Sequence, residues 1–261
     1  MKASQIPPYP QGHQLLAGKT VLVTAAAGTG IGFATARRCA EEGAAVMLSD
    51  KHEARLARCA EILQRETGQK VPFIICDVTD ETQVQALFDH AISEMGRLDV
   101  LVNNAGLGGT VEIVDMTDEQ WSRVLDVTLT GTFRCLQAAM RHMIPRAQGS
   151  IVNVGSALGW RAQAGQAHYS AAKAGVLALT RAAASEGAAA GVRVNAVVPS
   201  LVLHPNLAKV SSEEFLESLV EKEAMGRSAA PWEISNVIVF LASDLASYMT
   251  GEALSVSSQR A

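Results

Sequence analysis

The fold is decided by one stretch near the start of the chain, Thr20-Val21-Leu22-Val23-Thr24-Ala25-Ala26-Ala27-Gly28-Thr29-Gly30-Ile31-Gly32. A run of β-branched and apolar residues, 20–24, leads directly into a glycine-rich turn and then into a helical pattern over 30–42. Glycines let the backbone approach a ligand closely, and the first N–H groups of a helix face an anion. A strand, a glycine turn and a helix in this order therefore predict a site for a pyrophosphate group.

Short, nearly continuous apolar runs alternate with helical patterns along the rest of the chain. The expected strands are 20–24, 45–49, 72–76, 99–103, 150–154, 193–198 and 253–256. The expected helices are 30–42, 53–67, 80–95, 117–143, 166–190 and 231–242, with capping boxes at Thr117-x-x-Gln120 and Ser211-x-x-Glu214. Buried parallel strands are apolar throughout, and strand–helix alternation implies right-handed crossovers. The predicted fold class is α/β, a single Rossmann-like, doubly wound parallel sheet of about seven strands with helices on both faces.

The chain is expected to form one domain, because no internal repeat and no linker rich in Pro, Gly or Ser divides it. Residues 1–14 are interpreted as an N-terminal arm, and residues 15–261 as the single domain that carries the pyrophosphate site. Between 201 and 225 the strand–helix rhythm is interrupted, and this insertion is expected to form a lid.

Composition excludes several functional classes. Hydrophobic residues make up 48% and charged residues 18% of the chain, which suits a globular protein with a large core. The formal charge of −4, without a dense run of Lys or Arg, gives no electrostatic reason to expect nucleic acid or an anionic membrane as a partner. Every apolar stretch is shorter than the ~18 residues that a membrane helix requires. We therefore expect a protein that acts on a small molecule.

The cysteines and the first residues bear on the compartment. Cys39, Cys59, Cys76 and Cys135 lack the spacing of a disulfide framework or a zinc site, which suits a reducing environment. Residues 1–14 lack the apolar core of a signal peptide, so we predict a cytoplasmic location. The six histidines lack ligand spacing as well, and no metal is expected.

An acidic residue, Asp50, closes the second expected strand. In a dinucleotide-binding sheet, a carboxylate at this position accepts hydrogen bonds from the adenosine ribose hydroxyls and repels a 2′-phosphate. Asp50 therefore favours NAD over NADP as the cofactor, while Lys51 beside it would offset part of the repulsion.

Two further strands carry polar residues to the same edge of the sheet. Asp77 and Val78 follow the third strand and are expected close to the adenine. Asn104, Ala105 and Gly106 follow the fourth strand, at the crevice where such sheets bind ligands.

A tyrosine and a lysine four residues apart provide candidate chemistry. Tyr169 and Lys173 leave the same face of the expected helix 166–190, one turn apart. A lysine ammonium and an oxidised nicotinamide near the phenol would favour the phenolate, which would make Tyr169 a usable proton donor and acceptor near neutral pH. Ser156 lies just after the fifth strand, where its hydroxyl can hydrogen-bond a substrate oxygen.

Together these motifs resemble the classical form of the short-chain dehydrogenase/reductase family over residues 15–257. The matching motifs are the glycine turn at 24–32, Asp77, Asn103-Asn104-Ala105-Gly106, Ser156, Tyr169-x-x-x-Lys173, Asn195-Ala196-Val197-Val198-Pro199 and Phe240-Leu241-Ala242-Ser243-Asp244…Thr250-Gly251. The resemblance implies a nicotinamide-dependent oxidoreductase that transfers a hydride between its cofactor and a secondary alcohol or ketone. It also implies a homotetramer formed through the segments 117–143, 166–190 and 231–256.

The resemblance implies a role for each matched residue. Tyr169 would be the general acid/base, Ser156 would orient the substrate carbonyl, and Lys173 would bind the nicotinamide ribose and lower the pKa of the tyrosine. The residues expected to contact the cofactor are Thr24, Ala26, Gly28, Thr29, Gly30, Ile31, Asp50, Asp77, Val78, Asn104, Ala105, Gly106, Tyr169, Lys173, Pro199, Leu201 and Val202.

Several positions depart from the family pattern. The glycine turn has Ala25 where the first glycine usually stands, and it is one residue longer. Thr128 occupies the place of the family's fourth catalytic residue, an asparagine, and we expect its hydroxyl to bond back to a helix carbonyl. The other departures are Ser200 after Pro199, His204 in place of a threonine that contacts the cofactor, and the tail Val256-Ser257-Ser258-Gln259.

Within the family, this combination of motifs looks like bacterial enzymes that degrade steroid rings as coenzyme A thioesters. The substrate pocket is expected along 107–112, 157–163 and the lid, where Arg161 either meets an anionic substrate group or lies on the surface. His168 is expected to pack or to hydrogen-bond, not to act as a second base. Two alternatives stay open: a 3-oxoacyl-thioester (acyl carrier protein) reductase, against which Asp50 argues, and a cofactor-binding sensor or scaffold with weakened chemistry.

Overall fold

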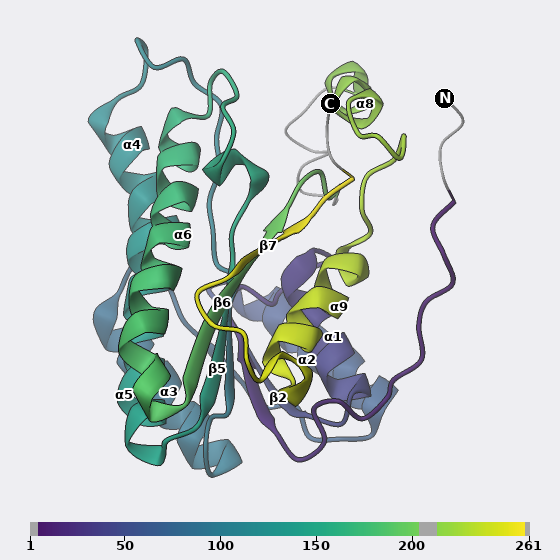
Figure 1. Cartoon of the computed structure of the whole chain (residues 1–261), viewed down its shortest axis with the longest axis vertical. Coiled ribbons are helices and arrows are strands. Elements are labelled where there is room, and N and C mark those ends of the chain that lie inside the picture. Colours follow the sequence, from purple (N-terminus) through teal and green to yellow (C-terminus); the bar gives the residue numbers. More distant parts are fainter. Residues whose placement is uncertain (1–4, 204–212, 259–261) are drawn as a thin grey trace.

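Seven parallel strands form one sheet in the computed structural model, which describes residues 5–203 and 213–258 (Figure 1). The strands are β1 (Thr20–Val23), β2 (Ala45–Asp50), β3 (Phe73–Ile75), β4 (Val100–Asn103), β5 (Gly149–Val154), β6 (Val192–Pro199) and β7 (Ala253–Val256). Their order in the sheet is β3-β2-β1-β4-β5-β6-β7. Each end lies within one residue of the expected strand, so the predicted parallel sheet is confirmed.

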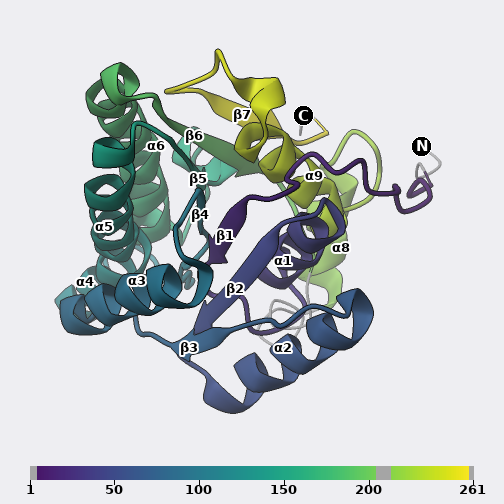
Figure 2. The same cartoon turned by 90° about the horizontal axis from the view of Figure 1, so that it is seen from below.

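Helices cover both faces of the sheet (Figure 2). They are α1 (Ile31–Glu41), α2 (Glu53–Thr67), α3 (Glu81–Met95), α4 (Asp118–Leu125), α5 (Gly131–Met143), α6 (Ala167–Gly187), α8 (Glu213–Glu221) and α9 (Pro231–Ala242). Successive strand side chains point to opposite faces. Val21 and Val23 thus join the core beneath α1, α2 and α9, whereas Leu22 joins the core beneath α3, α5 and α6. Within the described ranges, no helix is both long and apolar enough to cross a membrane.

The strand order places a crevice above β1 and β4. The chain runs from β1 outward to β3 and then returns to the other side of β1 to begin β4. The connections that leave β1 and β4 therefore diverge to opposite faces of the sheet, which opens a ligand site at the carboxyl ends of these strands.

Residues 117–143 form two α-helices, not the single helix that we expected. Thr117 caps α4 in the predicted capping box. The chain then passes through a π turn, Asp126–Thr130, in which the Gly131 N–H donates to the Asp126 carbonyl. Gly131 also packs tightly, since a Cβ there would lie 2.5 Å from Cγ2 of Val78. A widened turn shifts the helical register without interrupting the apolar pattern, so the sequence periodicity does not reveal it.

The arm is anchored on α1. The Tyr9 hydroxyl donates to Glu41 Oε2 at 2.7 Å. Oε2 of the buried Glu42 accepts the backbone N–H groups of His13 (2.8 Å) and Leu15 (3.1 Å). The described part of the arm thus packs against the helix that follows the glycine turn.

A buried carboxylate anchors the chain that leaves the expected lid. Glu223 accepts hydrogen bonds from the hydroxyls of Ser200 (3.0 Å) and Ser258 (2.6 Å). Two departures from the family pattern, the serine after Pro199 and Ser258 of the tail, therefore meet at one glutamate. His204, Ser211 of the second expected capping box, and Gln259 lie outside the described residues.

Candidate active site

The glycine turn leaves open space in front of α1. Gly28 adopts a φ of +138°, which favours glycine, and a Cβ on Gly28 or Gly30 would meet no atom within 4 Å. Gly30 is the N-cap of α1, and none of the described side chains caps this helix. Its first N–H groups can therefore face an anion, with Thr29 exposed in the turn and Ile31 at the first helical position. This arrangement fits the pyrophosphate of a nicotinamide dinucleotide.

Thr24 and Asn104 join the ends of β1 and β4. The Thr24 hydroxyl accepts the backbone N–H groups of Asn104 (3.0 Å) and Ala105 (3.2 Å). Asn104 Nδ2 donates to the carbonyls of Thr24 (3.1 Å) and Ala25 (3.0 Å). Ala25 has a φ of +50°, in the left-handed region that costs a non-glycine residue free energy. Asn104 thus holds the strained residue in place and braces the floor of the crevice.

Asp50 lies at the expected strand end, with its carboxylate bonded to the protein backbone. Oδ2 accepts the Ala27 N–H at 3.1 Å and Oδ1 accepts the His52 N–H at 3.0 Å. Ala26, which we also expected to contact the cofactor, is fully buried, and its N–H donates to the Ser49 carbonyl at 2.9 Å. Both residues therefore fix the glycine turn to β2.

Asp77 and Val78 follow β3 at the same edge of the sheet. Burial raises the pKa of Asp77, but hydrogen bonds from the N–H and hydroxyl of Thr79 outweigh it and hold the pKa below its ordinary value. Val78 is buried against Gly131 at the start of α5. The pair stands where the sequence places the adenine.

Ser156, Tyr169 and Lys173 come together beyond the end of β5. Ser156 caps the 3₁₀ turn Ala157–Gly159, its Oγ accepting the Leu158 N–H at 3.2 Å, and its side chain also acts on the pKa of the Tyr169 phenol. Lys173 Nζ lies 5.7 Å from the centroid of the Tyr169 ring. A hydroxyl, a phenol and a cation thus share one side of the crevice.

Burial decides in which direction the pKa of Tyr169 moves. Burial raises it, and the hydrogen bond from Ser156 opposes only part of this rise. Burial also lowers the pKa of Lys173 to about 8, and its Nζ donates to the Val154 carbonyl at 2.6 Å. Desolvation is thus the largest influence on the pKa of both groups in the protein alone, and the expected effect of Lys173 on the pKa of Tyr169 beside a bound cofactor stays a prediction.

His168 caps the first turn of α6. Its Nδ1 accepts the Tyr169 N–H at 2.9 Å, and burial lowers the pKa of the imidazole, which favours the neutral ring. The residue is a hydrogen-bonding element, as we expected, and it holds the backbone of the tyrosine.

Thr128 is fully buried in the π turn. Its hydroxyl accepts the Leu107 N–H (2.9 Å) and donates to the Leu107 carbonyl (3.1 Å). The expected bond to a helix carbonyl is therefore wrong; Thr132 makes such a bond, to the carbonyl of Thr128 at 2.8 Å. The Leu107 N–H and carbonyl are partly buried where the loop after β4 meets the helix, and the Thr128 hydroxyl is a hydrogen-bond partner for both. Gly106 lies beside both Thr128 and Lys173.

Pro199, Leu201 and Val202 carry the chain from β6 into the lid. The Leu201 carbonyl accepts the Ala229 N–H at 2.9 Å, and the buried Val202 forms a parallel bridge with Ala229. These contacts fix the base of the lid at the carboxyl edge of the sheet.

Some contributors to the site were missed in the sequence. Cys59 Sγ accepts the Gly28 N–H at 3.3 Å, the Val154 carbonyl holds Lys173, and Glu223 anchors the end of the lid. Each contact joins different elements, so a local pattern carries no signal for it. Among the residues that the structure describes, no three His, Cys, Asp or Glu side chains are placed to hold a metal ion.

The sheet and its crevice define a nicotinamide-dependent oxidoreductase. Residues 25–258 match a family described as enoyl-(acyl carrier protein) reductase. The crystal structure of a short chain dehydrogenase from Mycobacterium smegmatis is 52% identical, with a TM-score of 0.88 over 98% of this chain and 99% of that one. The chain belongs to the short-chain dehydrogenase/reductase family. It is an enzyme that transfers a hydride between a nicotinamide cofactor and a secondary alcohol or ketone.

Relatives of known activity extend this comparison. The (5R,7aS)-5-hydroxy-7a-methyl-1-oxo-2,3,5,6,7,7a-hexahydro-1H-indene-carboxyl-CoA reductase of Mycobacterium tuberculosis is 55% identical over 99% of both chains. The cis-4-hydroxycyclohexanecarboxylate dehydrogenase of Sinomonas cyclohexanicum is 43% identical over 93% of this chain and 96% of its own. A 3-oxoacyl-[acyl-carrier-protein] reductase of Thermotoga maritima is 38% identical over 92% and 97%. The crystal structure of an NAD⁺-bound xylitol dehydrogenase is 34% identical, with a TM-score of 0.87 over 93% and 99%.

Proposed function

We propose that the enzyme interconverts a ring ketone and its secondary alcohol on a fused-ring coenzyme A thioester of the kind formed in steroid-ring degradation. The full-length identity of 55% to the indene-carboxyl-CoA reductase supports this substrate class. The relative named for a hydroxylated cyclohexane acid supports the same ring chemistry. Reduction of 3-oxoacyl groups on acyl carrier protein is the weaker alternative, supported by the 38% identity to a reductase of that kind.

One observation carries the proposed chemistry: Ser156, Tyr169 and Lys173 gather beyond the end of β5, where the Ser156 side chain lowers the pKa of the Tyr169 phenol against burial and Lys173 Nζ lies 5.7 Å from the centroid of the Tyr169 ring. When bound, the nicotinamide supplies or accepts the hydride. In reduction, Tyr169 donates its phenolic proton to the carbonyl oxygen as the new C–H bond forms, and Ser156 holds that oxygen by a hydrogen bond. Lys173 binds the nicotinamide ribose and reduces the cost of the phenolate. Thr128 acts through Leu107, by fixing the loop beside the lysine.

Replacing Tyr169 with phenylalanine tests this assignment. We expect kcat to fall by roughly 10²- to 10⁴-fold, because only the hydroxyl transfers the proton. NADH affinity should change less than twofold, since Lys173 remains. Tyr248→Phe, at a fully exposed tyrosine, is the matched control. A Tyr169→Phe enzyme that keeps more than a tenth of wild-type kcat would refute the role.

We propose NAD(H) as the preferred cofactor. Asp50 holds a buried carboxylate next to Ala27 of the glycine turn, and a ribose 2′-phosphate would meet this charge. Titration of the enzyme with NADH and NADPH by nucleotide fluorescence should show at least tenfold tighter binding of NADH, which is ~1.4 kcal/mol. Equal affinities or a preference for NADPH would contradict the proposal, and Asp50→Asn should narrow the difference.

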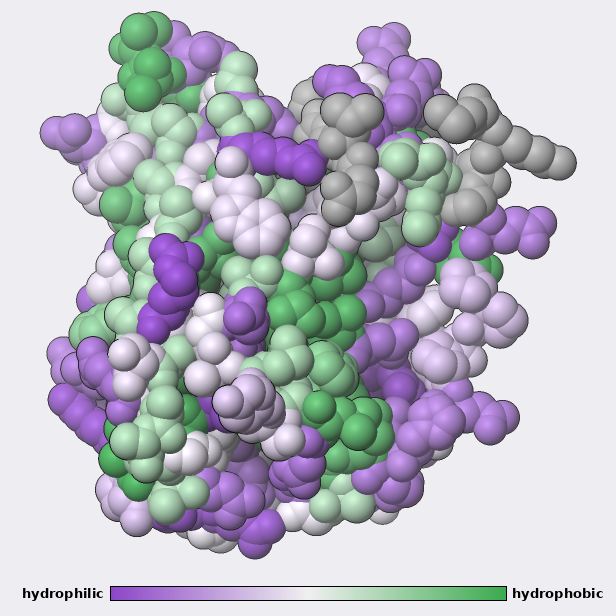
Figure 3. All heavy atoms as spheres, in the orientation of Figure 1, coloured by the Kyte–Doolittle hydropathy of each residue, from purple (hydrophilic) through white to green (hydrophobic). Residues whose placement is uncertain are grey.

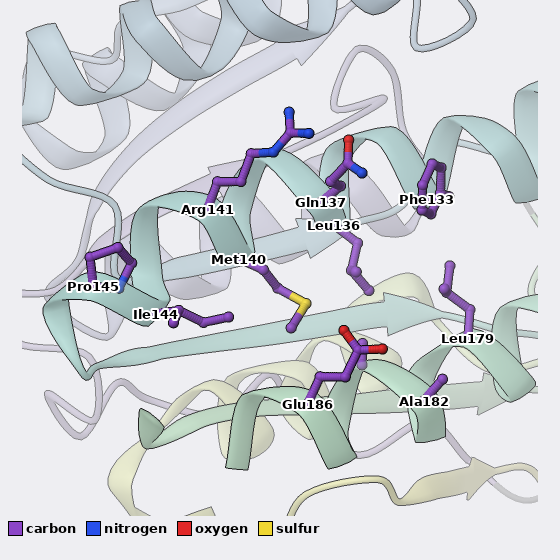
Figure 4. A pocket seen from close by; sticks show the side chains of 11 residues that line it. Phe133, Leu136, Gln137, Met140, Arg141, Ile144, Pro145, Leu179, Ala182 and Glu186 are labelled. Carbon is purple, nitrogen blue, oxygen red and sulfur yellow. The ribbon is translucent and has the colours of Figure 1, made fainter. Parts of the chain in front are cut away.

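We propose a homotetramer built on two apolar faces. The first is a groove of about 330 Å³ between α5 and α6, whose lining side chains Figure 4 shows. Phe133 and Ile144, at its two ends, are each about two-fifths exposed (42% and 38%). The second face includes α9, β7 and the turn between them, where Figure 3 shows hydrophobic surface and where Leu245 and Tyr248 are exposed. Large exposed apolar patches mark interaction surfaces, and two separate faces let a closed tetramer form. A mass of 27.5 kDa by light scattering at micromolar concentration would contradict the proposal.

We further propose that the segment around α8 closes over the bound substrate, and that the enzyme works in the cytoplasm. The hydrogen bonds that anchor Glu223 at the end of this segment support a hinge there. The four cysteines are all unpaired and buried, which supports a reducing compartment. Protease accessibility of residues 201–225 with and without NADH and substrate would test closure. We keep residues 1–14 as a separate arm and 15–261 as the catalytic domain in this proposal.

A further inference from the structure

A cavity of about 620 Å³ lies beside α1, outside the crevice. It is bounded by α1, α2, the start of α9 and the arm; the three helices lie together on one face of the sheet (Figure 2). Gly28 and Thr29 border it, and Cys59, which accepts the Gly28 N–H, forms part of its wall. The glycine turn thus borders both this cavity and the expected pyrophosphate position.

Three guanidinium groups line the cavity. Arg37 pairs with Glu66 at 2.8 Å and lies over the Phe33 ring at 5.2 Å. Arg55 and Arg58 are exposed one turn apart on α2, and among the described residues neither side chain has an ion pair or hydrogen bond. None of the described lining residues is acidic. Like charges one turn apart on a helix repel, so an anion bound between the two guanidinium groups would be stabilising.

The same cavity carries flat apolar rings. Trp232 and Tyr9 meet edge to face with their centroids 5.4 Å apart, and both line the cavity together with Phe33. Aromatic and guanidinium planes bind flat heterocycles by stacking, and guanidinium groups bind phosphate through paired hydrogen bonds. A basic rim beside aromatic rings is the chemistry that recognises a phosphorylated nucleoside.

We infer that this cavity binds the phosphorylated adenosine end of the coenzyme A thioester substrate, an inference that rests on the proposed function. The chain as a whole has a net charge of −4, whereas three arginines cluster at this cavity. This local positive charge favours the binding of a strongly anionic group. The position beside the glycine turn keeps this end of the substrate apart from the crevice in which the ring reacts. The 2′-phosphoadenosine end of NADP(H) carries the same chemistry and is the other source of such a ligand.

The test uses the full-length enzyme with Arg55 and Arg58 both changed to alanine. Arg65→Ala is the matched control, since Arg65 is an exposed arginine of the same helix that does not line the cavity. KM and kcat are measured with a fused-ring keto acid presented as its coenzyme A thioester and as its methyl ester. Binding of adenosine 3′,5′-bisphosphate, NADH and NADPH is measured by calorimetry, and melting temperatures confirm that each variant folds.

We expect the double variant to raise KM for the thioester at least tenfold and to weaken bisphosphate binding by a similar factor. Its kcat, its KM for the methyl ester and its NADH affinity should stay within twofold of wild type, as should every value for Arg65→Ala. Unchanged thioester KM and bisphosphate affinity in the double variant, or no bisphosphate binding by wild type, would overturn the inference. A selective loss of NADPH affinity would assign the cavity to the cofactor instead. Bisphosphate binding without thioester turnover would refute the proposed substrate and leave the cavity as a nucleotide site.

Discussion

Replacing Lys173 with methionine should stabilise the folded protein while it removes activity. Burial lowers the pKa of Lys173 from 10.5 to about 8, and at ~1.4 kcal/mol per pH unit the buried cation costs the fold about 3 kcal/mol at pH 7. Methionine is apolar and of similar length, so it removes this cost. It also loses the hydrogen bond to the Val154 carbonyl, which is worth ~1 kcal/mol. The expected net gain is ~2 kcal/mol of unfolding free energy at pH 7, with turnover lost because the ribose and the phenolate lose their cation.

The pH dependence identifies the cause of this gain. Folded Lys173 releases its proton above pH 8, whereas the unfolded chain holds its proton up to about 10.5. Wild-type stability therefore rises relative to the variant between these two values, and the advantage of methionine is full below pH 8 and gone by pH 10.5. Urea unfolding of both proteins without cofactor, at one protein concentration and at pH 7 and 10.5, measures the difference. A methionine variant less stable than wild type at pH 7, or a stability difference equal at both pH values, would refute the reasoning.

Other parts of the site give further expected outcomes. Thr128→Val should lower the unfolding free energy by ~2 kcal/mol, because the N–H and the carbonyl of Leu107 both lose their hydrogen-bond partner. Thr128→Ser keeps the hydroxyl and should retain most of the wild-type stability. Equal urea midpoints for the two variants would contradict this. Glu223→Ala removes the shared acceptor of two serine hydroxyls, so we expect faster proteolysis within 201–225 and a higher KM, and wild-type cleavage rates would rule this out. Gly32→Ala places a Cβ 2.5 Å from Asn104 Nδ2, so it should displace Asn104 and weaken NADH binding at least tenfold. Fluorescence titration with NADH measures this, and an unchanged affinity would show that Asn104 moves without cost to cofactor binding.

The sequence alone was enough for the sheet and for the elements that carry the site. Apolar runs such as 20–24 and 253–256 are buried strands because periodicity and burial are local properties of a chain, and the observed strands differ from them by no more than a residue at either end. The spacing of Tyr169 and Lys173 likewise fixed a shared helix face, since four residues make about one turn. The glycine turn and Asp50 were placed at one edge by the rule that parallel strands end together.

Only the tertiary structure decided what each side chain in the crevice contacts. The Thr128 hydroxyl bonds to Leu107 and not within its own helix, and Asp50 accepts the Ala27 N–H of the glycine turn. Burial among residues of several segments also raises the pKa of Tyr169. The hydrogen-bond partners and the desolvation of a side chain depend on which groups of distant segments pack around it. The local sequence pattern that determines helices and strands does not contain this information. The arginines of α1 and α2 are a further example. In the sequence they are ordinary charged helix residues, and only the packing of the two helices places them around one cavity.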